Sequence, residues 1–158
     1  MDLYENFFSV ISALQKEKVE YVLIGGFAVV LHGFPRATQD IDLFLKPTEE
    51  NIARLRKALH QVFDDPAIQE ISLNELNKYP VIRYGTPDGF SIDLIVNIGE
   101  MFSYDDIQFE LRNIDDQPMR IATPRSLLEM KRNTYREIDQ LDVKFLLKKI
   151  EREDNDGN

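Results

Sequence analysis

The sequence predicts an α+β fold with one mixed β-sheet, flanking helices and a long helix at the C-terminus. Three observations favour it. The chain has 158 residues, the length of one domain. Segments with the apolar spacing of helices alternate with short apolar runs typical of strands. A hairpin signal adds antiparallel strands to this alternation, which indicates a mixed sheet. We expect the domain to span residues 1–150, followed by a polar tail, 151–158, that frays.

The first half of the chain alternates helices with buried strands. Apolar side chains recur at helical spacing over residues 3–17. "VEYVLIGG" predicts a buried strand that ends at two glycines, and "GFAVVLHG" predicts a short apolar helix that ends at Gly33. A second strand, "DIDLFLKP", ends at Pro47, and Thr48 can cap a helix that runs to about Val62. The short helix therefore connects two buried strands.

The second half begins with the hairpin. "YPVIRYGTPDGFSIDLIVN" contains two strand-like runs joined by "TPDG", whose Pro, Asp and Gly are typical of tight turns. We expect a short helix near "MFSYDDIQ" and a strand pair around "FELRNID" and "MRIAT". Pro124 suits the first position of a helix, and one long helix is predicted from there through about Ile150.

Composition and charge exclude several classes of function. No stretch approaches the roughly 20 apolar residues that cross a bilayer, and the N-terminus lacks the pattern of a signal peptide. We therefore expect no membrane partner and a cytoplasmic location. The formal net charge of −9 argues against broad, non-specific binding of nucleic acid. With no cysteine and only two histidines, His32 and His60, the chain would hold any metal through oxygen atoms.

Three aspartates are predicted to share one face of the sheet. Side chains alternate along a strand, so Asp40 and Asp42 point the same way while Ile41 points to the core. The same alternation sends Asp93 to the face opposite Ile92, on a strand that could lie beside the first. Three such carboxylates repel one another by several kcal/mol unless they are protonated or neutralised. Two Mg²⁺ ions, or Mn²⁺ in their place, would neutralise them and could clamp a phosphoryl group during an in-line displacement.

Two glycines supply a site for an anion. Gly25 and Gly26 lie where the first strand turns into the short helix, a place where backbone N–H groups and the helix dipole favour negative charge. We expect the phosphates of a nucleotide there, beside the carboxylates. Arg36 and Thr38, in the following loop, either bind phosphate or only order the loop. His32, on a mostly apolar helix, is expected to be a core or capping residue.

These motifs resemble a known superfamily. "IGG", thirteen residues, then "DIDL", with a later isolated "IDL", is similar to the signature of nucleotidyltransferases of the DNA polymerase beta type. "GGFAVVLHGFPRATQDIDL" and "KRNTYREIDQLD" are similar to the small bacterial nucleotidyltransferases of the AbiEii type, which are related to toxin–antitoxin systems. The resemblance covers about residues 20–150 and implies a minimal nucleotidyltransferase fold.

The resemblance also implies a role for each residue. Asp40 and Asp42 would bind both metals, and Asp93 would complete the catalytic metal site near the acceptor. Gly25 and Gly26 would hold the phosphates of an NTP. The implied reaction is Mg²⁺-dependent transfer of a nucleoside monophosphate to an acceptor hydroxyl, with release of pyrophosphate. The acceptor could be RNA, a protein or a small molecule.

The predicted C-terminal helix carries two charges on its apolar face. At about 100° per residue, Lys131 and Asp142 both fall inside the apolar stripe. They are eleven residues apart, roughly 16 Å along a continuous helix, which is too far for a contact between them. A nucleotide phosphate is therefore a candidate partner for Lys131, and Arg36 or Arg83 for Asp142.

Alternatives stay open at this point. A degenerate member of the family would bind nucleotide or a partner protein without transfer, as an antitoxin-like or regulatory module would. The carboxylates could also serve only charge-paired packing, in which case neutralising one of them lowers stability. The larger members of the AbiEii branch carry more C-terminal helical sequence, which favours a protein partner or a homodimer that completes the cleft.

Overall fold

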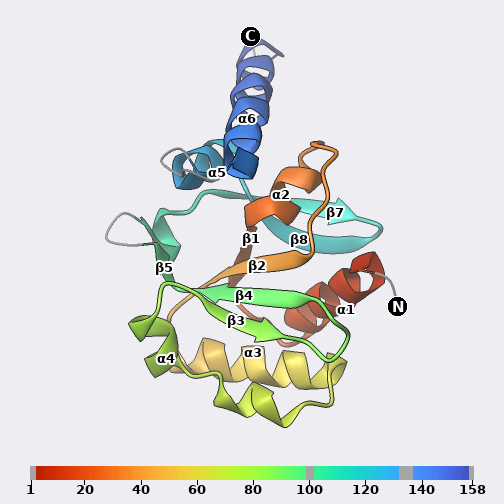
Figure 1. Cartoon of the computed structure of the whole chain (residues 1–158), viewed down its shortest axis with the longest axis vertical. Helices are drawn as coiled ribbons and strands as arrows, with labels where there is room; N and C mark the ends of the chain where they lie inside the picture. The colour runs from red at the N-terminus through yellow and green to blue at the C-terminus, as the bar shows by residue number, and fades with distance from the viewer. Residues whose placement is uncertain (1–2, 99–101, 132–136, 157–158) are drawn as a thin grey trace.

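The chain folds into a six-stranded sheet with helices on both faces, as the sequence predicts (Figure 1). The computed structural model describes residues 3–98, 102–131 and 137–156. In chain order the elements are α1 (Leu3–Lys16), β1 (Tyr21–Ile24), α2 (Gly25–Leu31), β2 (Asp40–Leu45), α3 (Glu49–Val62), the 3₁₀ helix η1 (Pro66–Glu70), α4 (Leu73–Lys78), β3 (Ile82–Gly85), β4 (Ser91–Ile95), β5 (Asn97–Ile98), β6 (Phe102–Ser103), the 3₁₀ helix η2 (Tyr104–Asp106), β7 (Phe109–Ile114), β8 (Gln117–Ala122), α5 (Pro124–Lys131) and α6 (Glu137–Asp156).

The sheet is mixed, and its strands lie in the order β3-β4-β2-β1-β8-β7. β2 pairs with β4 and β1 pairs with β8 in parallel, whereas the other three pairings are antiparallel. β5 and β6 form a separate antiparallel pair. The predicted hairpin is the β3–β4 pair, and the predicted late strand pair is β7–β8. The α+β class is therefore confirmed.

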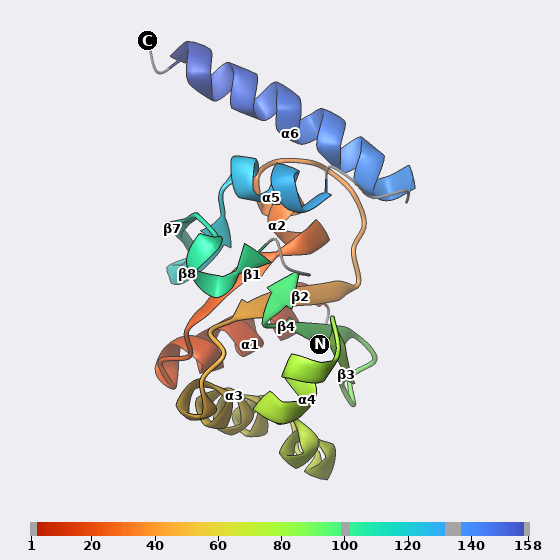
Figure 2. The same cartoon turned by 90° about the vertical axis from the view of Figure 1, so that its left-hand side faces the viewer.

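Helices cover the sheet from two sides. α1 and α3 pack against each other on one face, and α2, α5 and α6 gather on the other (Figure 2). The central strands β1 and β2 lie between these layers, and β1 is buried along its whole length. One face of the paired strands β2 and β4 is therefore turned toward the layer that contains α2 and α5.

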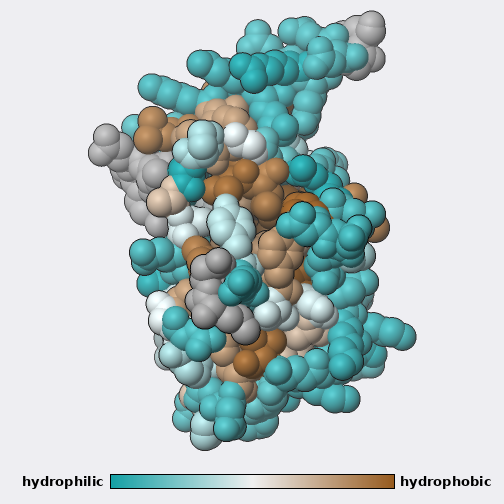
Figure 3. Space-filling view, turned by 90° about the vertical axis from the view of Figure 1, so that its right-hand side faces the viewer, coloured by the Kyte–Doolittle hydropathy of each residue, from teal (hydrophilic) through white to brown (hydrophobic). Residues whose placement is uncertain are grey.

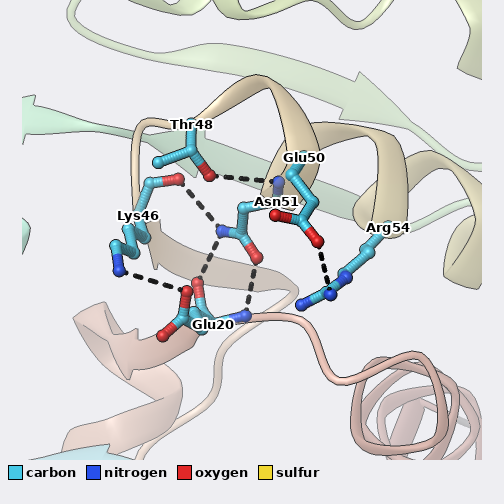
Figure 4. Close-up of polar contacts among 6 residues, drawn as sticks. All are labelled: Glu20, Lys46, Thr48, Glu50, Asn51 and Arg54. Carbon is cyan, nitrogen blue, oxygen red and sulfur yellow. Dashed lines mark hydrogen bonds and ion pairs between the residues drawn. The ribbon is translucent and has the colours of Figure 1, made fainter.

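The start of α3 fastens the two central strands together (Figure 4). The nearly buried Asn51 side chain donates to the carbonyl oxygens of Glu20 (2.9 Å) and Lys46 (3.0 Å), and it accepts from the Glu20 N–H (2.7 Å). Thr48 caps the helix through its side chain, as predicted, by accepting from the Asn51 N–H at 3.1 Å. Because Glu20 precedes β1 and Lys46 follows β2, this cap helps to fix the register of the strands that carry the site.

The predicted long C-terminal helix is present as α6, but the prediction that it runs unbroken from Pro124 is wrong. In place of one helix the structure has α5, which ends at Lys131, and α6, which begins at Glu137, and the two helices pack against each other. α6 also continues past Ile150 to Asp156, through most of the segment that was expected to fray. Ion pairs stabilise this end: Arg125 binds Asp154 at 2.7 Å, and Lys149 lies 3.7 Å from Glu153 one turn later.

The face shown in Figure 3 is largely hydrophilic, and hydrophobic residues gather in its middle, below α6. Within the three described ranges, no helix combines the length and the apolar character that crossing a membrane requires.

Candidate active site

The three predicted catalytic aspartates come from two adjacent parallel strands. β2 and β4 pair so that Asp42 lies opposite Asp93 and Asp40 lies opposite Ser91. Residues in register on parallel strands point to the same face of the sheet. The three carboxylates therefore share one face, and Ile41, between the first two, is fully buried on the other.

This pairing belongs to a row that crosses four strands. Arg83 of β3 lies opposite Asp93, Asp93 lies opposite Asp42, and Asp42 lies opposite Ile24 of β1. We call these four residues the cross-strand row. The chain leaves β1 at Ile24 and enters α2 at once with Gly25, so the glycine turn stands at the end of this row.

Both glycines of the turn make room for other side chains of the same chain. Gly25 has a φ of +73°, and a Cβ at this position would lie 1.8 Å from Oδ2 of Asp42. A Cβ on Gly26 would lie 2.6 Å from Nη1 of Arg36. From the sequence, the two glycines were assigned the role of letting a phosphate approach the backbone. The structure adds that the Asp42 carboxylate and the Arg36 guanidinium already press against this turn.

Mutual repulsion and burial make Asp42 difficult to ionise. Desolvation raises the pKa of Asp42 to about 7, and a hydrogen bond with Asp93 and the charges of Asp93 and Asp40 act in the same direction. The charge of Lys131 lowers the pKa of Asp42 in part. Near neutral pH, Asp42 therefore exchanges a proton unless another cation neutralises the group.

Arg83 binds two of the three aspartates. Its Nε lies 2.9 Å from Oδ1 of Asp93, and its Nη2 lies 3.2 Å from Oδ2 of the same group. Nη2 also lies 3.6 Å from Oδ2 of Asp40. The hydrogen bond to Asp93 raises the pKa of Arg83 above its usual value. Arg83 is therefore part of the carboxylate cluster and is not the partner of Asp142.

A cavity of about 520 Å³ opens over the cluster. This is the size of a pocket for a small molecule. Its polar lining consists of Gly25, Asp40, Asp42, Arg83, Asp93, Lys131 and Asp139, and its apolar lining of Ile24, Val81, Ile95, Ile98, Leu127 and Met130. The lining thus combines charged side chains with an apolar part, which we call the apolar wall.

The predicted nucleotide-binding residues are only partly brought together. Gly25 and Lys131 line this cavity, but Gly26, Arg36 and Thr38 do not. The Thr38 hydroxyl donates to the carbonyl oxygen of Asp40 at 3.4 Å, and Arg36 and Thr38 line a different hollow beside α1. In this structure both residues therefore lie in the loop that leads into β2 and away from the cavity over the carboxylates.

Lys131 sits in a buried cluster of four charges. Its Nζ lies 2.8 Å from Oδ1 of Asp139 and 3.2 Å from Oδ2 of Asp142, and Nε of Arg36 lies 3.1 Å from Oδ1 of Asp142. The conclusion that Lys131 and Asp142 are too far apart to pair is therefore wrong, because α5 and α6 fold against each other. The expected partnership of Asp142 with Arg36 is confirmed. Asp142 is fully buried, and neither of its carboxylate oxygens has a hydrogen bond of good geometry within the described residues. Ion pairs with Lys131 and Arg36 therefore hold the Asp142 carboxylate.

His32 is a core residue, as predicted. Its side chain is buried, and Nε2 lies 2.8 Å from the carbonyl oxygen of Ala122 at the end of β8. Burial lowers the pKa of His32, so the neutral ring is favoured. It takes no part in the cavity.

A comparison with protein families shows which family the chain belongs to. The model of the family described as "Nucleotidyl transferase AbiEii toxin, Type IV TA system" matches residues 10–154. The chain belongs to the AbiEii nucleotidyltransferase family. No curated protein matches this AbiEii-family sequence.

Solved structures show the same fold. The crystal structure of the lincosamide antibiotic adenylyltransferase LnuA, with lincomycin bound, has a TM-score of 0.61 and 17% identity, over 90% of this chain and 94% of that one. An antigenic nucleotidyltransferase-like protein from Paracoccidioides brasiliensis has a TM-score of 0.56 and 19% identity, over 92% of this chain and 74% of that one. These likenesses extend over nearly the whole AbiEii-family chain.

The residues of the AbiEii-family site fit divalent cations by their chemistry. All donors of the cluster are carboxylate oxygens, and the repulsion that raises the pKa of Asp42 is what bound cations would relieve. Within the part of the chain that the structure describes, however, no group of three or more acidic or histidine side chains has converged to chelate an ion. Arg83 instead contacts Asp93 and Asp40.

Sequence analysis missed the place of Arg83 in the site. The signal was available in the hairpin. The turn around Pro87–Gly89 pairs Gly85 with Ser91, and counting outward from it sets Arg83 opposite Asp93. Leu127, Met130 and Asp139 were also not predicted to line the site, because they come from α5 and α6, whose packing against each other was not foreseen.

Proposed function

We propose that the protein transfers a nucleoside monophosphate from an NTP to an acceptor hydroxyl, with release of pyrophosphate, in a reaction that requires Mg²⁺ or Mn²⁺. The cross-strand row supports this most, because it sets Asp42 beside Asp93 and against Gly25 in one cavity. The reaction needs carboxylates for metal and a turn that admits phosphate at the same place. Membership of the AbiEii family supports the same chemistry.

Each group would have a distinct part. Asp40, Asp42 and Asp93 would hold the divalent ions, whose charge would offset that of the phosphates and lower the pKa of the acceptor hydroxyl. Gly25 would let the triphosphate approach the backbone at the start of α2, and the Lys131 ammonium would face its negative charge. Catalysis would then consist mainly of positioning and charge neutralisation.

Gly26, Arg36 and Thr38 would support the site without lining its cavity. Arg36 packs over Gly26 and pairs with Asp142, and Thr38 bonds to the backbone at Asp40. These contacts would hold the loop between α2 and β2, and with it the first carboxylate. We therefore propose for them the loop-ordering role, the second of the two that the sequence left open.

The acceptor stays open among RNA, protein and small molecules. LnuA acts on a lincosamide according to its name, but at 17% identity only the fold carries over. The apolar wall of the cavity favours an acceptor that presents apolar surface next to its hydroxyl. The family description names a toxin of a type IV toxin–antitoxin system, and we include that role, with a protein partner, in the proposal.

One observation favours a second candidate function. Arg83 already neutralises part of the acidic cluster, and no three carboxylates have converged in the described residues. A module that binds nucleotide or a partner protein without transfer would need no divalent ion beyond this neutralisation by Arg83. Such a module should bind NTP weakly and with no dependence on Mg²⁺, whereas the enzyme should require the ion.

Transfer of label from each α-³²P NTP tests the proposal. The protein is incubated with Mg²⁺ and separate RNA, protein and small-molecule fractions of a cell extract, and the label in each fraction is measured. The Asp40→Asn/Asp42→Asn variant should transfer none, and Asp64→Asn, which alters an exposed aspartate outside the cavity, should transfer as much as the unmodified chain. Equal transfer by the double variant would overturn the proposed mechanism.

A further inference from the structure

Arg83 lies where a bound cation would neutralise the acidic cluster. It is the first residue of the cross-strand row, and its guanidinium spans Asp93 (2.9 and 3.2 Å) and Asp40 (3.6 Å). These are two of the three aspartates proposed to bind metal. A guanidinium that grips both oxygens of Asp93 competes with a divalent ion for the lone pairs of that carboxylate, and the two positive charges repel one another.

The two partners differ in how firmly they are held. The Arg83 side chain is 61% exposed, whereas the Asp93 side chain is 10% exposed. Because its guanidinium is exposed, Arg83 can turn out into water and keep its hydration when it leaves Asp93. The buried aspartate cannot turn to solvent in the same way, so its ionised form requires a cation beside it.

A second hollow beside Arg83 could receive its side chain. It lies on the rim shared by the active-site cavity and a neighbouring hollow of about 530 Å³. Glu70 and Glu75 line that hollow. A released guanidinium would thus find room and opposite charge on the far side of β3.

We propose that Arg83 is a tethered cation that neutralises Asp40 and Asp93 until a divalent ion displaces it. Its departure sets the affinity of the site for the metal. The inference rests on the metal dependence in the proposed function and adds a positioning residue to it. In the resting protein Arg83 holds the acids in place; in the loaded protein the acids have exchanged Arg83 for Mg²⁺ or Mn²⁺.

Binding of Mn²⁺ alone, measured by calorimetry on the full chain without nucleotide, tests the displacement. Arg83→Gln should bind Mn²⁺ about tenfold more tightly, because no arginine has to leave. Arg83→Lys keeps the charge but loses the fork that grips two oxygens, so it should bind severalfold more tightly than the unmodified chain. Arg54→Gln, which removes an exposed arginine paired with Glu50 on α3, is the matched control and should change nothing.

The side-chain Nε–H resonance of Arg83 gives a second measurement that activity does not affect. It is assigned by its loss in Arg83→Lys, and saturating Mg²⁺ should shift it while the Arg54 resonance stays in place. Unchanged Mn²⁺ affinity in both variants, or tighter binding by Arg83→Gln with Arg83→Lys equal to the unmodified chain, would reject the displacement and leave the metal site standing. If neither the unmodified chain nor Arg83→Gln binds Mn²⁺, the metal dependence and this inference both fall.

Discussion

Nζ of Lys131 lies 3.2 Å from Oδ2 of Asp142, although the two residues are eleven positions apart in sequence. The contact exists because α5 and α6 fold against each other, and it joins Arg36 and Asp139 in a buried cluster whose formal charge is balanced. Lys131 is also a wall of the active-site cavity. The packing of α6 is thereby connected to the proposed nucleotide site through one side chain.

Asp142→Asn should lower the free energy of unfolding by about 2 to 4 kcal/mol, because two buried cations lose their shared partner. The measurement is urea unfolding of the full chain. Lys131→Met/Asp142→Leu should recover much of the loss, since it removes one charge of each sign and leaves Arg36 and Asp139 balanced. Additive losses in the double variant would show that the two residues do not act as a pair.

Asp42→Asn should abolish transfer and yet stabilise the metal-free protein by about 1 to 3 kcal/mol at pH 8. The pKa of Asp42 is raised to about 7, so between about pH 4 and pH 7 the folded state binds the proton more tightly than the unfolded state. Each rise in pH through this window therefore removes stability from the unmodified chain but not from the variant. Urea unfolding in EDTA at pH 5 and pH 8 should show the advantage of the variant growing with pH. A variant less stable than the unmodified chain at pH 8 would favour the packing-only role of the carboxylates.

Mg²⁺ should raise the melting temperature of the unmodified chain and should release protons on binding at pH 6. The ion binds the ionised carboxylate, whereas at pH 6 Asp42 is mainly protonated. Calorimetry in two buffers of different ionisation enthalpy should give close to one proton released at pH 6 and almost none at pH 8.5. EDTA should reverse the thermal shift. Asp42→Asn should show neither effect.

Gly25→Ala should lower the free energy of unfolding by about 1 to 3 kcal/mol and abolish transfer. The new Cβ meets the Asp42 carboxylate, and the φ of +73° is strained for any residue with a side chain. Gly85→Ala is the matched control, because a Cβ there has no neighbour within 4 Å. In an Asp42→Ala background the loss should shrink to the backbone strain alone, about 1 kcal/mol. An equal loss in both backgrounds would mean that the carboxylate does not press on the turn.

The sequence was sufficient where local patterns decide structure. Strand alternation predicts that Asp40 and Asp42 point together, and the structure adds the parallel β2–β4 pairing that brings Asp93 beside them. It was insufficient where tertiary packing overrides a pattern. After Pro124 no Gly or Pro interrupts the helical periodicity up to residue 150, so one helix was predicted. Two signs of a break were available: Thr134 and Glu137 match the T-x-x-E pattern of a helix start, and two charges, Lys131 and Asp142, fall on an apolar face.

The cross-strand row makes the site a sensor of strand alignment. Asp42 and Asp93 are 51 positions apart in the chain, and Arg83 reaches Asp93 only because the β3–β4 hairpin closes at one particular turn. A slip of one residue between β2 and β4 would turn one acid away from the other. A misaligned sheet therefore cannot contain a working site, so the appearance of metal binding during refolding should coincide with the final, correct pairing of the central strands.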